Sequence, residues 1–317
     1  MAVTEQDALA RDFSSHRAHL LSVAYRLTGS VADAEDAVQE TWMRLAALSP
    51  EQLAGIRDRR AWLTTVAGRI CLDRLRSATA RRERYVGEWL PEPIVTSVGG
   101  PPAGGGIGED PLEAVVRDDG VRMAAMLVLD RLTPEQRVAF VLHDAFSVPF
   151  DEIAEILGCA PATARQHGSR GRRALADAEP PARVPLSEQR ELLERFVAAV
   201  LSGDIKAVAE VLHPDAMIVG DSNGKARTTR RVMVGAEKIM RFIAGLVERY
   251  EPGVFATARP VLVNGDLGFF LEASRASTPG RHDVDAHLQT VAIRDGWIVA
   301  IYDQANPDKL GRVPDAG

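Results

Sequence analysis

Arginines gather in two stretches of this 317-residue chain and equip it to bind phosphate. Residues 52–84 hold nine arginines against three acids, and PATARQHGSRGRRAL at 161–175 holds four arginines and no acid. Arginine presents a planar fork of donors that matches phosphate oxygens, so two such basic surfaces are typical of nucleic-acid binding. The whole chain is nevertheless acidic, with a formal net charge of −6. Acidic and basic surfaces must therefore be separate.

Carboxylates form a second pattern near the N-terminus. In SVADAEDAVQETWMRLAAL, Asp33, Asp36, Glu40 and Arg44 recur three or four residues apart and so share one face of a helix. Taken alone, the stripe fits a solvated helix face as well as a docking surface for a partner.

Histidines and acids in the C-terminal third are candidates for acid–base chemistry. His213, Asp221, His287 and Asp303 have suitable side chains, but such catalysis needs them within hydrogen-bond reach of one another. Their spacing does not establish this, and we expect no catalytic residue. The pair His143–Asp144 has no nucleophile motif beside it, so we expect a structural or surface histidine.

The two cysteines and the apolar runs exclude several classes of protein. Cys71 and Cys159 are far apart and make neither a disulfide framework nor a zinc set, so we expect small buried hydrophobes. No apolar run is long enough for a bilayer, and the start has no basic-then-apolar signal region. We therefore expect a cytoplasmic protein with no metal, no cofactor and no membrane contact.

Helices must position the acidic and basic residues of the first half. Ser30 or Asp33 is a plausible cap for the acidic helix, whose inward positions are Val31, Ala34, Val38, Trp42 and Leu45. The segment RAWLTTVAGRICLDRLRSA predicts a second helix with inward Leu63, Val66, Ala67, Ile70 and Cys71, and with Arg69, Asp73 and Arg76 outward.

A helix-turn-helix is expected before residue 178. Thr133 opens a capping box with Gln136, and FDEIAEILG reads as a short amphipathic helix that ends at Gly158. A small Ala154, a glycine four residues later and an apolar Ala164 have helix-turn-helix spacing. The basic helix that Pro161 begins would then enter the major groove.

The remaining segments predict a linker and a second kind of domain. Residues 85–118 include VGGPPAGGGIG, which favours a flexible linker over a helix or a central strand. After PARVP, the pattern changes to two helices, a short strand AMIVGD, an amphipathic helix GAEKIMRFIAGLVERY and four further strands, of which the first is VFATARPVLV at 254–263. Hairpin signals stand at Asn264–Gly265 and Asp295–Gly296. We expect an α+β domain in which helices pack on one antiparallel sheet.

The motifs DAEDAVQETWMRL, AWLTTVAGRICLDRLR, LTPEQRVAFVL and FDEIAEILG together resemble a bacterial sigma factor of the extracytoplasmic-function group. The resemblance covers roughly residues 8–178 and implies two all-α domains. These are region 2 over 1–84 and the region 4 helix-turn-helix over 119–180, joined by the linker at 85–118.

The C-terminal part, residues 186–312, resembles a SnoaL-like domain of the NTF2-like cone fold. Sigma factors with this domain share three short motifs, and they stand here as WLPEP at 89–93, NPDKL at 306–310 and an altered DSNGK at 221–225. The resemblance implies a regulatory contact through Trp89, Leu90, Pro91, Asp221, Lys225, Asn306, Pro307, Asp308, Lys309 and Leu310.

The sigma-factor resemblance implies a role for each matching position. The acidic helix corresponds to the surface that docks on the clamp helices of the largest polymerase subunit, through Asp33, Asp36, Gln39 and Glu40. The stretch after it corresponds to the −10 reader, through Arg57, Arg59, Arg60, Trp62, Arg69, Asp73 and Arg76. The basic helix corresponds to the −35 reader, through Thr163, Arg165, Gln166, Ser169, Arg170, Arg172 and Arg173.

The sequence therefore predicts a non-enzymatic promoter-specificity subunit that binds core RNA polymerase, including its flap, and promoter DNA. We expect its C-terminal domain to modulate activity and to offer a pocket for an unknown small ligand. Two alternatives remain open at this point, namely a helix-turn-helix regulator that acts without polymerase and a SnoaL-like enzyme with a vestigial sigma part.

We also expect WLPEP and NPDKL to meet. Trp89 on a glycine-rich linker would be an orphan apolar group, so it should dock on the C-terminal domain. Lys309 would orient the docked segment through an exposed ion pair worth less than about 1 kcal/mol. The sequence thus predicts that Trp89→Ala alters transcription more than Lys309→Ala does.

Overall fold

A computed structural model describes residues 2–82, 85–98, 111–116 and 119–314. The chain divides into two compact units. The first comprises residues 1–84, 103–121 and 125–180, and the second comprises 85–102, 122–124 and 181–317. Across the ranges described, no helix combines the length and the apolar content needed to cross a bilayer.

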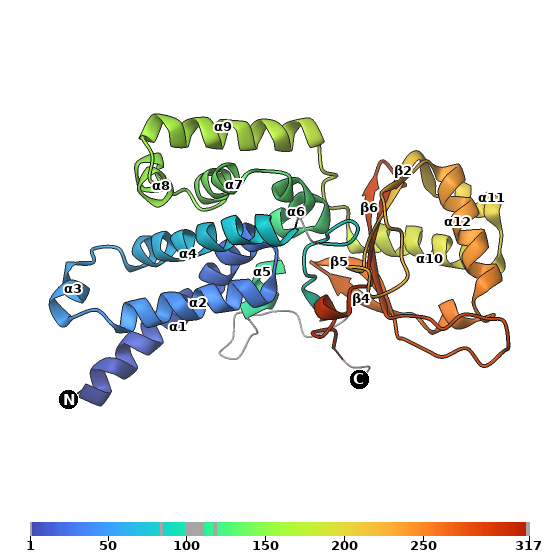
Figure 1. The fold of residues 1–317 in the computed structure, drawn as a ribbon, viewed down its shortest axis with the longest axis horizontal. Helices are drawn as coiled ribbons and strands as arrows, with labels where there is room; N and C mark the ends of the chain where they lie inside the picture. The colour runs from blue at the N-terminus through green and yellow to red at the C-terminus, as the bar shows by residue number, and fades with distance from the viewer. Residues whose placement is uncertain (1, 83–84, 99–110, 117–118, 315–317) are drawn as a thin grey trace. The chain divides into compact units, whose positions relative to one another are not determined.

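The N-terminal half of the first unit is a helical bundle (Figure 1). Its helices are α1 (Ala2–Thr28), α2 (Val31–Ala46), α3 (Pro50–Gly55) and α4 (Arg59–Arg82). Ser30 caps α2 by accepting a hydrogen bond from the Asp33 amide, as one of the two proposed caps requires. The apolar positions predicted to face inward on α4 are all buried, and those predicted to face outward are exposed.

Shorter helices follow in the same unit: α5 (Pro111–Val116), η1 (Asp119–Val121), α6 (Met123–Asp130), α7 (Pro134–Phe140), the π-helical turn η2 (Val141–Ala145), α8 (Phe150–Leu157) and α9 (Pro161–Ala178). The capping box of Thr133 and Gln136 opens α7 as predicted. Gly158 ends α8 with a φ of 67°, in the left-handed region that glycine tolerates. The predicted helix-turn-helix is therefore present as α8 and α9.

Small residues let α9 lie close to the helices before it. Ala164, Gly168 and Gly171 are buried on one face of α9. A Cβ at Gly168 would lie 2.9 Å from the Phe150 ring, and one at Gly171 would lie 2.6 Å from Phe140 Cβ. These glycines thus serve packing, and the arginines of α9 are left on the opposite, exposed face.

The N-terminal bundle and the helix-turn-helix pack together within the first unit. Helix α4 contacts α7 and α8. Gly68 on α4 lies where a Cβ would approach Leu142 to 3.2 Å and Ile156 to 3.4 Å. The buried Arg137 guanidinium on α7 donates to the backbone carbonyl of Arg26 on α1 at 2.9 Å. Both predicted DNA-reading helices therefore belong to one compact body.

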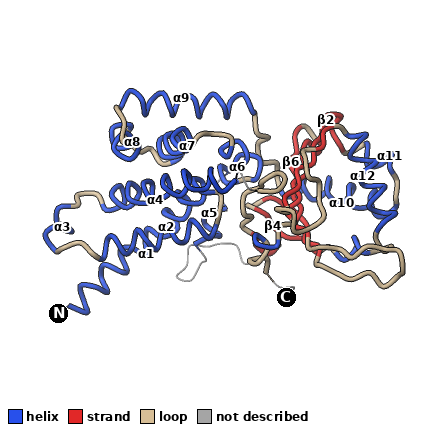
Figure 2. Tube along the Cα trace, in the orientation of Figure 1, coloured by secondary structure: helices blue, strands red, loops and turns tan. Residues whose placement is uncertain are grey.

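The second unit is an α+β domain in which helices cover one face of a seven-stranded sheet. Figure 2 shows α10 (Leu186–Ser202), α11 (Ile205–Ala209) and α12 (Ala236–Arg249) beside the strands. The sheet order is β1 (Val95–Ser97), β4 (Arg259–Val263), β5 (Asp266–Leu271), β6 (His287–Arg294), β7 (Trp297–Gln304), β2 (Leu212–Asp221) and β3 (Met233–Val234). The 3₁₀ turns η3 (Val254–Thr257) and η4 (Pro307–Lys309) flank it.

The sheet differs from the predicted antiparallel sheet at one pairing. Strands β2 and β7 run parallel, because β3, α12 and the strands β4 to β6 form a long crossover connection between them and β7 returns beside β2. The other pairs are antiparallel, and the hairpins turn at Asn264–Gly265 and Asp295–Gly296 with positive φ, as predicted. The segment 254–257, expected at the start of a strand, is a 3₁₀ turn.

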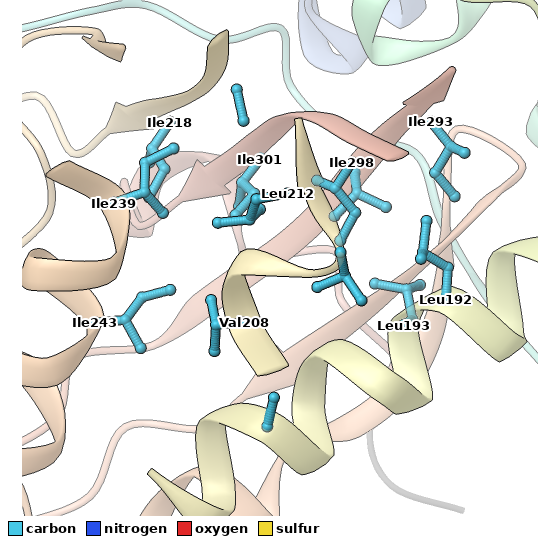
Figure 3. Close-up of a cluster of buried hydrophobic side chains, with 14 of the residues drawn as sticks. Leu192, Leu193, Val208, Leu212, Ile218, Ile239, Ile243, Ile293, Ile298 and Ile301 are labelled. Carbon is cyan, nitrogen blue, oxygen red and sulfur yellow. The ribbon is translucent and has the colours of Figure 1, made fainter. Parts of the chain in front are cut away.

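The core of the second unit lies between the helices and the covered face of the sheet. Figure 3 shows Leu192 and Leu193 of α10 and Ile239 and Ile243 of α12 directed toward strand residues such as Ile301. All are buried, so this layer removes a continuous apolar surface from water.

Part of the segment expected to be a flexible linker has regular structure. Residues 95–97 form β1, which pairs with β4 at the edge of the sheet, and 111–116 form α5. The sequence could not reveal β1, because three residues in a proline-rich stretch carry no periodic signal. Most of the glycine-rich run lies at 99–110, outside the residues described.

Candidate functional site

The acidic stripe lies on α2 and is held by an arginine of α4. Asp36 and Gln39 are exposed, and Asp33 and Glu40 are half-buried. Arg74 Nη1 lies 3.2 Å from Asp33 Oδ1 and 3.5 Å from Asp36 Oδ2, and its Nη2 lies 3.9 Å from Glu40 Oε2. The structure therefore brings the four predicted residues onto one surface. Sequence reasoning missed Arg74, whose only signal was its place in the basic block.

The predicted −10 residues lie along α4 and the turn before it. Arg57, Arg60, Arg69, Asp73 and Arg76 are exposed. Two of them meet acids of the helix-turn-helix half of the first unit, because Arg76 Nη2 lies 3.1 Å from Glu135 Oε1 and Arg69 Nη2 lies 3.8 Å from Glu155 Oε2. These arginines have protein partners in this arrangement.

The other −10 candidates are half-buried near α1. Arg59 Nε lies 3.4 Å from Asp12 Oδ2, and Trp62 is also half-buried. Arg60 Nη2 lies 3.0 Å from His19 Nδ1. Burial first, and then the charges of Arg60 and His16, lower the pKa of His19 to about 4, so this imidazole is neutral at pH 7 and can accept from Arg60.

The −35 candidates form the exposed face of α9. Six of the seven are exposed, namely Arg165, Gln166, Ser169, Arg170, Arg172 and Arg173, while Thr163 is half-buried. Arg172 Nε donates to Asp144 Oδ1 at 2.6 Å, and Arg165 Nη2 lies 3.7 Å from Asp151 Oδ1. The arginine-rich face is thus partly neutralised by carboxylates of its own unit.

Residues without a predicted DNA role behave as structural groups. The His143 ring stacks on Phe150 with centroids 4.0 Å apart, and its Nδ1 bonds the Val148 carbonyl at 3.0 Å. Trp42 is half-buried and tilts against Phe13 at 5.1 Å. The expectation of a structural rather than a catalytic histidine at position 143 fits this geometry.

In the second unit, one buried carboxylate, that of Asp221, accepts hydrogen bonds from the WLPEP and NPDKL motifs. Asp221 ends β2 and has no exposed surface. Its Oδ2 accepts from the Leu90 amide at 2.8 Å and from Lys309 Nζ at 2.7 Å, and its Oδ1 accepts from the Tyr85 hydroxyl at 2.5 Å. Residues 221, 309 and 90 therefore meet, although more than 200 positions separate the last two in the chain.

Lys309 contacts three residues of the 85–90 segment. Its Nζ donates to the Leu90 carbonyl at 2.6 Å and lies 4.3 Å from the Trp89 ring centroid and 5.1 Å from that of Tyr85. An ammonium over aromatic faces gains cation–π attraction in addition to its ion pair. We call Tyr85, Leu90, Asp221, Asn306 and Lys309 the linker clasp, since they hold the segment after α4 against the sheet.

Asparagines complete the attachment of this segment. Asn306 Nδ2 donates to the Tyr85 hydroxyl at 2.8 Å. The Asn264 side chain accepts from the Ile94 amide at 2.8 Å, and the Asn264 amide donates to the Ile94 carbonyl at 2.8 Å. Burial first, and then the hydrogen bond and charge of Asp221, raise the pKa of Tyr85, so the phenol keeps its proton and can donate.

The ten residues of the predicted regulatory contact do not contribute equally. Leu90, Pro91, Asp221 and Asn306 are buried, Trp89, Lys309 and Leu310 are half-buried, and Lys225, Pro307 and Asp308 are exposed. Lys225 pairs with Asp308 and so joins the DSNGK and NPDKL segments at the surface.

The ion pair of Lys309 differs from the exposed pair that we expected. Its side chain is 13% exposed and the Asp221 side chain is fully buried, so removing either residue would leave an uncompensated buried charge. Leu90, rather than Trp89, is the fully buried apolar residue of the segment. The sequence missed Tyr85, because nothing in VGEWLPEP points to the residue before it.

A second anchor lies at the other end of the linker. The buried Arg122 guanidinium, immediately before α6, donates through Nε to Asp266 Oδ2 at 2.8 Å and through Nη1 to the Pro181 carbonyl at 2.5 Å. Arg183 Nε and Gln189 Nε2 donate to Asp266 Oδ1 at 3.3 and 3.1 Å. The C-terminal domain thus holds residues 85–97 and residue 122.

Two of the four acid–base candidates meet, and the other two lie elsewhere. His287 Nδ1 and Asp303 Oδ1 are 2.9 Å apart on neighbouring strands β6 and β7. Asp221 belongs to the linker clasp, and His213 accepts a hydrogen bond from the Asp215 amide at 3.1 Å. A joint site of all four residues is therefore absent.

Comparison with known proteins accounts for nearly the whole chain. Family models match as Sigma-70 region 2 over residues 13–81, Sigma-70 region 4 over 122–175, and a SnoaL-like domain over 193–301. The extracytoplasmic-function (ECF) RNA polymerase sigma factor SigJ of Mycobacterium tuberculosis is 49% identical over 306 residues, which cover 96% of this chain and 93% of SigJ.

Other relatives agree. The probable ECF RNA polymerase sigma factor SigI of M. tuberculosis is 33% identical and covers 82% of this chain and 83% of its own length. The crystal structure of M. tuberculosis SigJ superposes with a TM-score of 0.79 at 46% identity, over 96% of this chain and 99% of SigJ. These matches confirm the predicted fold class of two helical sigma domains followed by a SnoaL-like domain. The chain belongs to the extracytoplasmic-function RNA polymerase sigma factors and carries a C-terminal SnoaL-like domain.

Proposed function

We propose that this sigma factor reads promoters through α4 and α9 and is restrained by its own C-terminal domain through the linker clasp. Sigma factors are non-enzymatic partners of core RNA polymerase and promoter DNA, and the chain shares that role through its family. The finer assignments below concern individual surfaces.

The exposed part of the α2 stripe suits docking on the clamp helices of the largest polymerase subunit. Asp36 and Gln39 are exposed, and Arg74 pairs with the carboxylates of Asp33 and Asp36. Complementary charge across such a surface favours association and suppresses wrong partners. We assign the flap contact to the region 4 helices, α7 to α9, as the family suggests.

The compact first unit does not suit simultaneous reading of both promoter elements. The −10 and −35 elements are centred roughly 25 base pairs apart, which is about 85 Å at 3.4 Å per base pair. A compact unit of this size has a radius of gyration of about 15 Å, and hence a diameter of roughly 40 Å. Region 2 and region 4 must therefore separate before α4 and α9 can both bind.

Two features of the first unit would oppose that separation. Arg69 and Arg76 on α4 pair with Glu155 and Glu135, and Gly68 lets α4 pack tightly against η2 and α8. Exposed ion pairs contribute little, so the apolar packing at Gly68 is the stronger restraint.

The linker clasp adds a restraint that acts on the connection between the two regions. Residues 85–97 and Arg122 are attached to the same domain, so both ends of the connection are fixed while the clasp is closed. Releasing residues 85–98 lengthens the free chain between the regions and lowers the cost of separating them. The buried Asp221–Lys309 pair on the Leu90 backbone is the observation that carries this proposal.

Run-off transcription with core polymerase tests the proposal. Lys309→Ala should raise the yield at limiting sigma factor, whereas Lys238→Ala, which removes an exposed lysine of α12, should leave it unchanged. Binding to core polymerase, measured separately, should stay at the native affinity for both variants. Native yield from a folded Lys309→Ala protein would refute the proposed restraint.

A further inference from the structure

The helix-covered face of the C-terminal sheet carries a cavity whose lining shares no residue with the predicted DNA- and polymerase-binding surfaces. Its volume is about 240 Å³. Five aromatic side chains line it, from α10, α12, the turn after α12 and β5: Phe196, Phe242, Tyr250, Phe255 and Phe269. Most of the remaining wall is aliphatic, so the cavity is suited to an apolar molecule.

The polar groups of the cavity converge at one place. Asp303 accepts from His287 Nδ1 at 2.9 Å, from Gln289 Nε2 at 3.1 Å and from the Thr228 hydroxyl, and all four residues line the cavity. These donors occupy both carboxylate oxygens. His287 directs Nδ1 to Asp303, which leaves Nε2 as the polar atom that can serve a bound molecule.

The protonation state of His287 favours a ligand that carries a hydrogen-bond acceptor. Burial alone would lower the pKa of His287, but the charge and hydrogen bond of Asp303, with a smaller effect of Asp285, raise it above the ordinary value. Burial alone would raise the pKa of Asp303, but His287, Thr228 and Gln289 lower it. A protonated imidazole donates from both nitrogens. Arg227 also lines the cavity; it is exposed and donates through Nη1 to the Asp283 carbonyl at 3.1 Å, so its positive charge lies at the edge of the site.

The cavity size limits the ligand. An apolar protein cavity of about 150 Å³ holds benzene, so 240 Å³ has room for one or two rings. We infer that this cavity binds a one- or two-ring apolar carboxylate whose oxygen accepts a hydrogen bond from His287 Nε2. The aromatic side chains would surround the rings, while the remaining lining excludes water.

The site is separate from the linker clasp. Strands β2 and β7 pair Gly220 with Asp303 and Asp221 with Gln304, and successive residues of a strand face opposite sides. Asp303 therefore faces the cavity, and Asp221 faces the clasp on the other side of the sheet. Ligand binding consequently goes beyond the proposed restraint and does not depend on it.

Isothermal titration calorimetry of the full chain with 2-naphthoate tests the inference. We expect saturable binding with one site, and at least tenfold weaker binding of 2-naphthylmethylammonium, which has the same rings and the opposite charge. His287→Gln should weaken 2-naphthoate at least tenfold, because it replaces a charge-assisted donor by a neutral one. His213→Gln, a histidine outside the cavity, should bind as the native protein does.

Ala258→Trp provides a second variant, since it adds bulk to the cavity wall and leaves His287 and Asp303 in place. It should abolish 2-naphthoate binding. Circular dichroism checks the fold of each variant, and the comparison of the two probes on the native protein stands even if a variant fails to fold. The inference is overturned if the native chain shows no saturable 2-naphthoate binding, if both probes bind equally, or if folded His287→Gln retains native affinity.

Discussion

Replacing Lys309 by alanine removes the cation that pairs with the fully buried Asp221 carboxylate of the linker clasp. The substitution leaves the Asp221 carboxylate without a cation in a site with no solvent exposure, and it also removes the donor to the Leu90 carbonyl. When the clasp opens, Asp221 regains water. The loss of the Lys309 charge therefore raises the free energy of the closed clasp and leaves that of the open clasp nearly unchanged.

The size of the effect follows from this geometry. Removing one partner of a buried ion pair costs about 3–5 kcal/mol. Asp221 keeps hydrogen bonds from Tyr85 and the Leu90 amide, so we take the lower end, about 3 kcal/mol. At 1.36 kcal/mol per tenfold, this shifts the clasp toward opening by about 10²-fold. Trp89→Ala removes a cation–π contact of about 0.5–1 kcal/mol and some apolar contact, which reverses the ranking expected from the sequence.

Hydrogen exchange measures this opening directly. The Leu90 amide donates to Asp221 and exchanges only when the clasp opens. We expect the peptide covering residues 85–98 to exchange about 10²-fold faster in Lys309→Ala and at the native rate in Lys238→Ala. Equal protection of this peptide in a folded Lys309→Ala protein would show that the buried pair does not hold the segment.

Three further predictions concern the first unit. Asp36→Arg combined with Glu40→Arg should abolish binding to core polymerase with helicity retained, because like charges then meet at the docking surface; co-elution at native affinity would contradict it. Arg172→Ala and Arg173→Ala should each lower the salt slope of promoter binding by about one without changing sequence preference, and unchanged slopes for both would exclude phosphate contacts. Gly68→Leu would clash with the buried side chains of η2 and α8, so it should separate region 4 from region 2 and raise run-off transcription. Gly55→Leu, at a position with no heavy atom within 4 Å of a Cβ, should leave transcription unchanged.

The sequence predicted the helices, caps and turns of this protein better than the long-range contacts between them. The caps of Ser30 and Thr133, the turn at Gly158 and the inward faces of the helices follow from local chemistry that a sequence displays directly. The family and fold class followed from motif order and are confirmed by the comparisons. The caps, the turn and the inward faces are determined by residues that are close together in the chain.

Long-range contacts were predictable only where motifs suggested them. WLPEP and NPDKL were expected to meet, but the burial of Asp221 beside Lys309 depends on the parallel return of β7 beside β2, which no periodicity reveals. Arg74 was missed for a similar reason, because its three acidic neighbours lie on another helix. The roles of individual DNA- and polymerase-binding residues remain predictions of the sequence and the family.

The central claim is that the clasp in the C-terminal domain keeps region 2 and region 4 together. Spin labels at Ser77→Cys on α4 and Ala176→Cys on α9, in a Cys159→Ser background with Cys71 left buried, report the distance between the regions by double electron–electron resonance. We predict one short distance in the protein with an intact clasp and a second, longer population after Lys309→Ala. Identical distance distributions for the two proteins would contradict the claim.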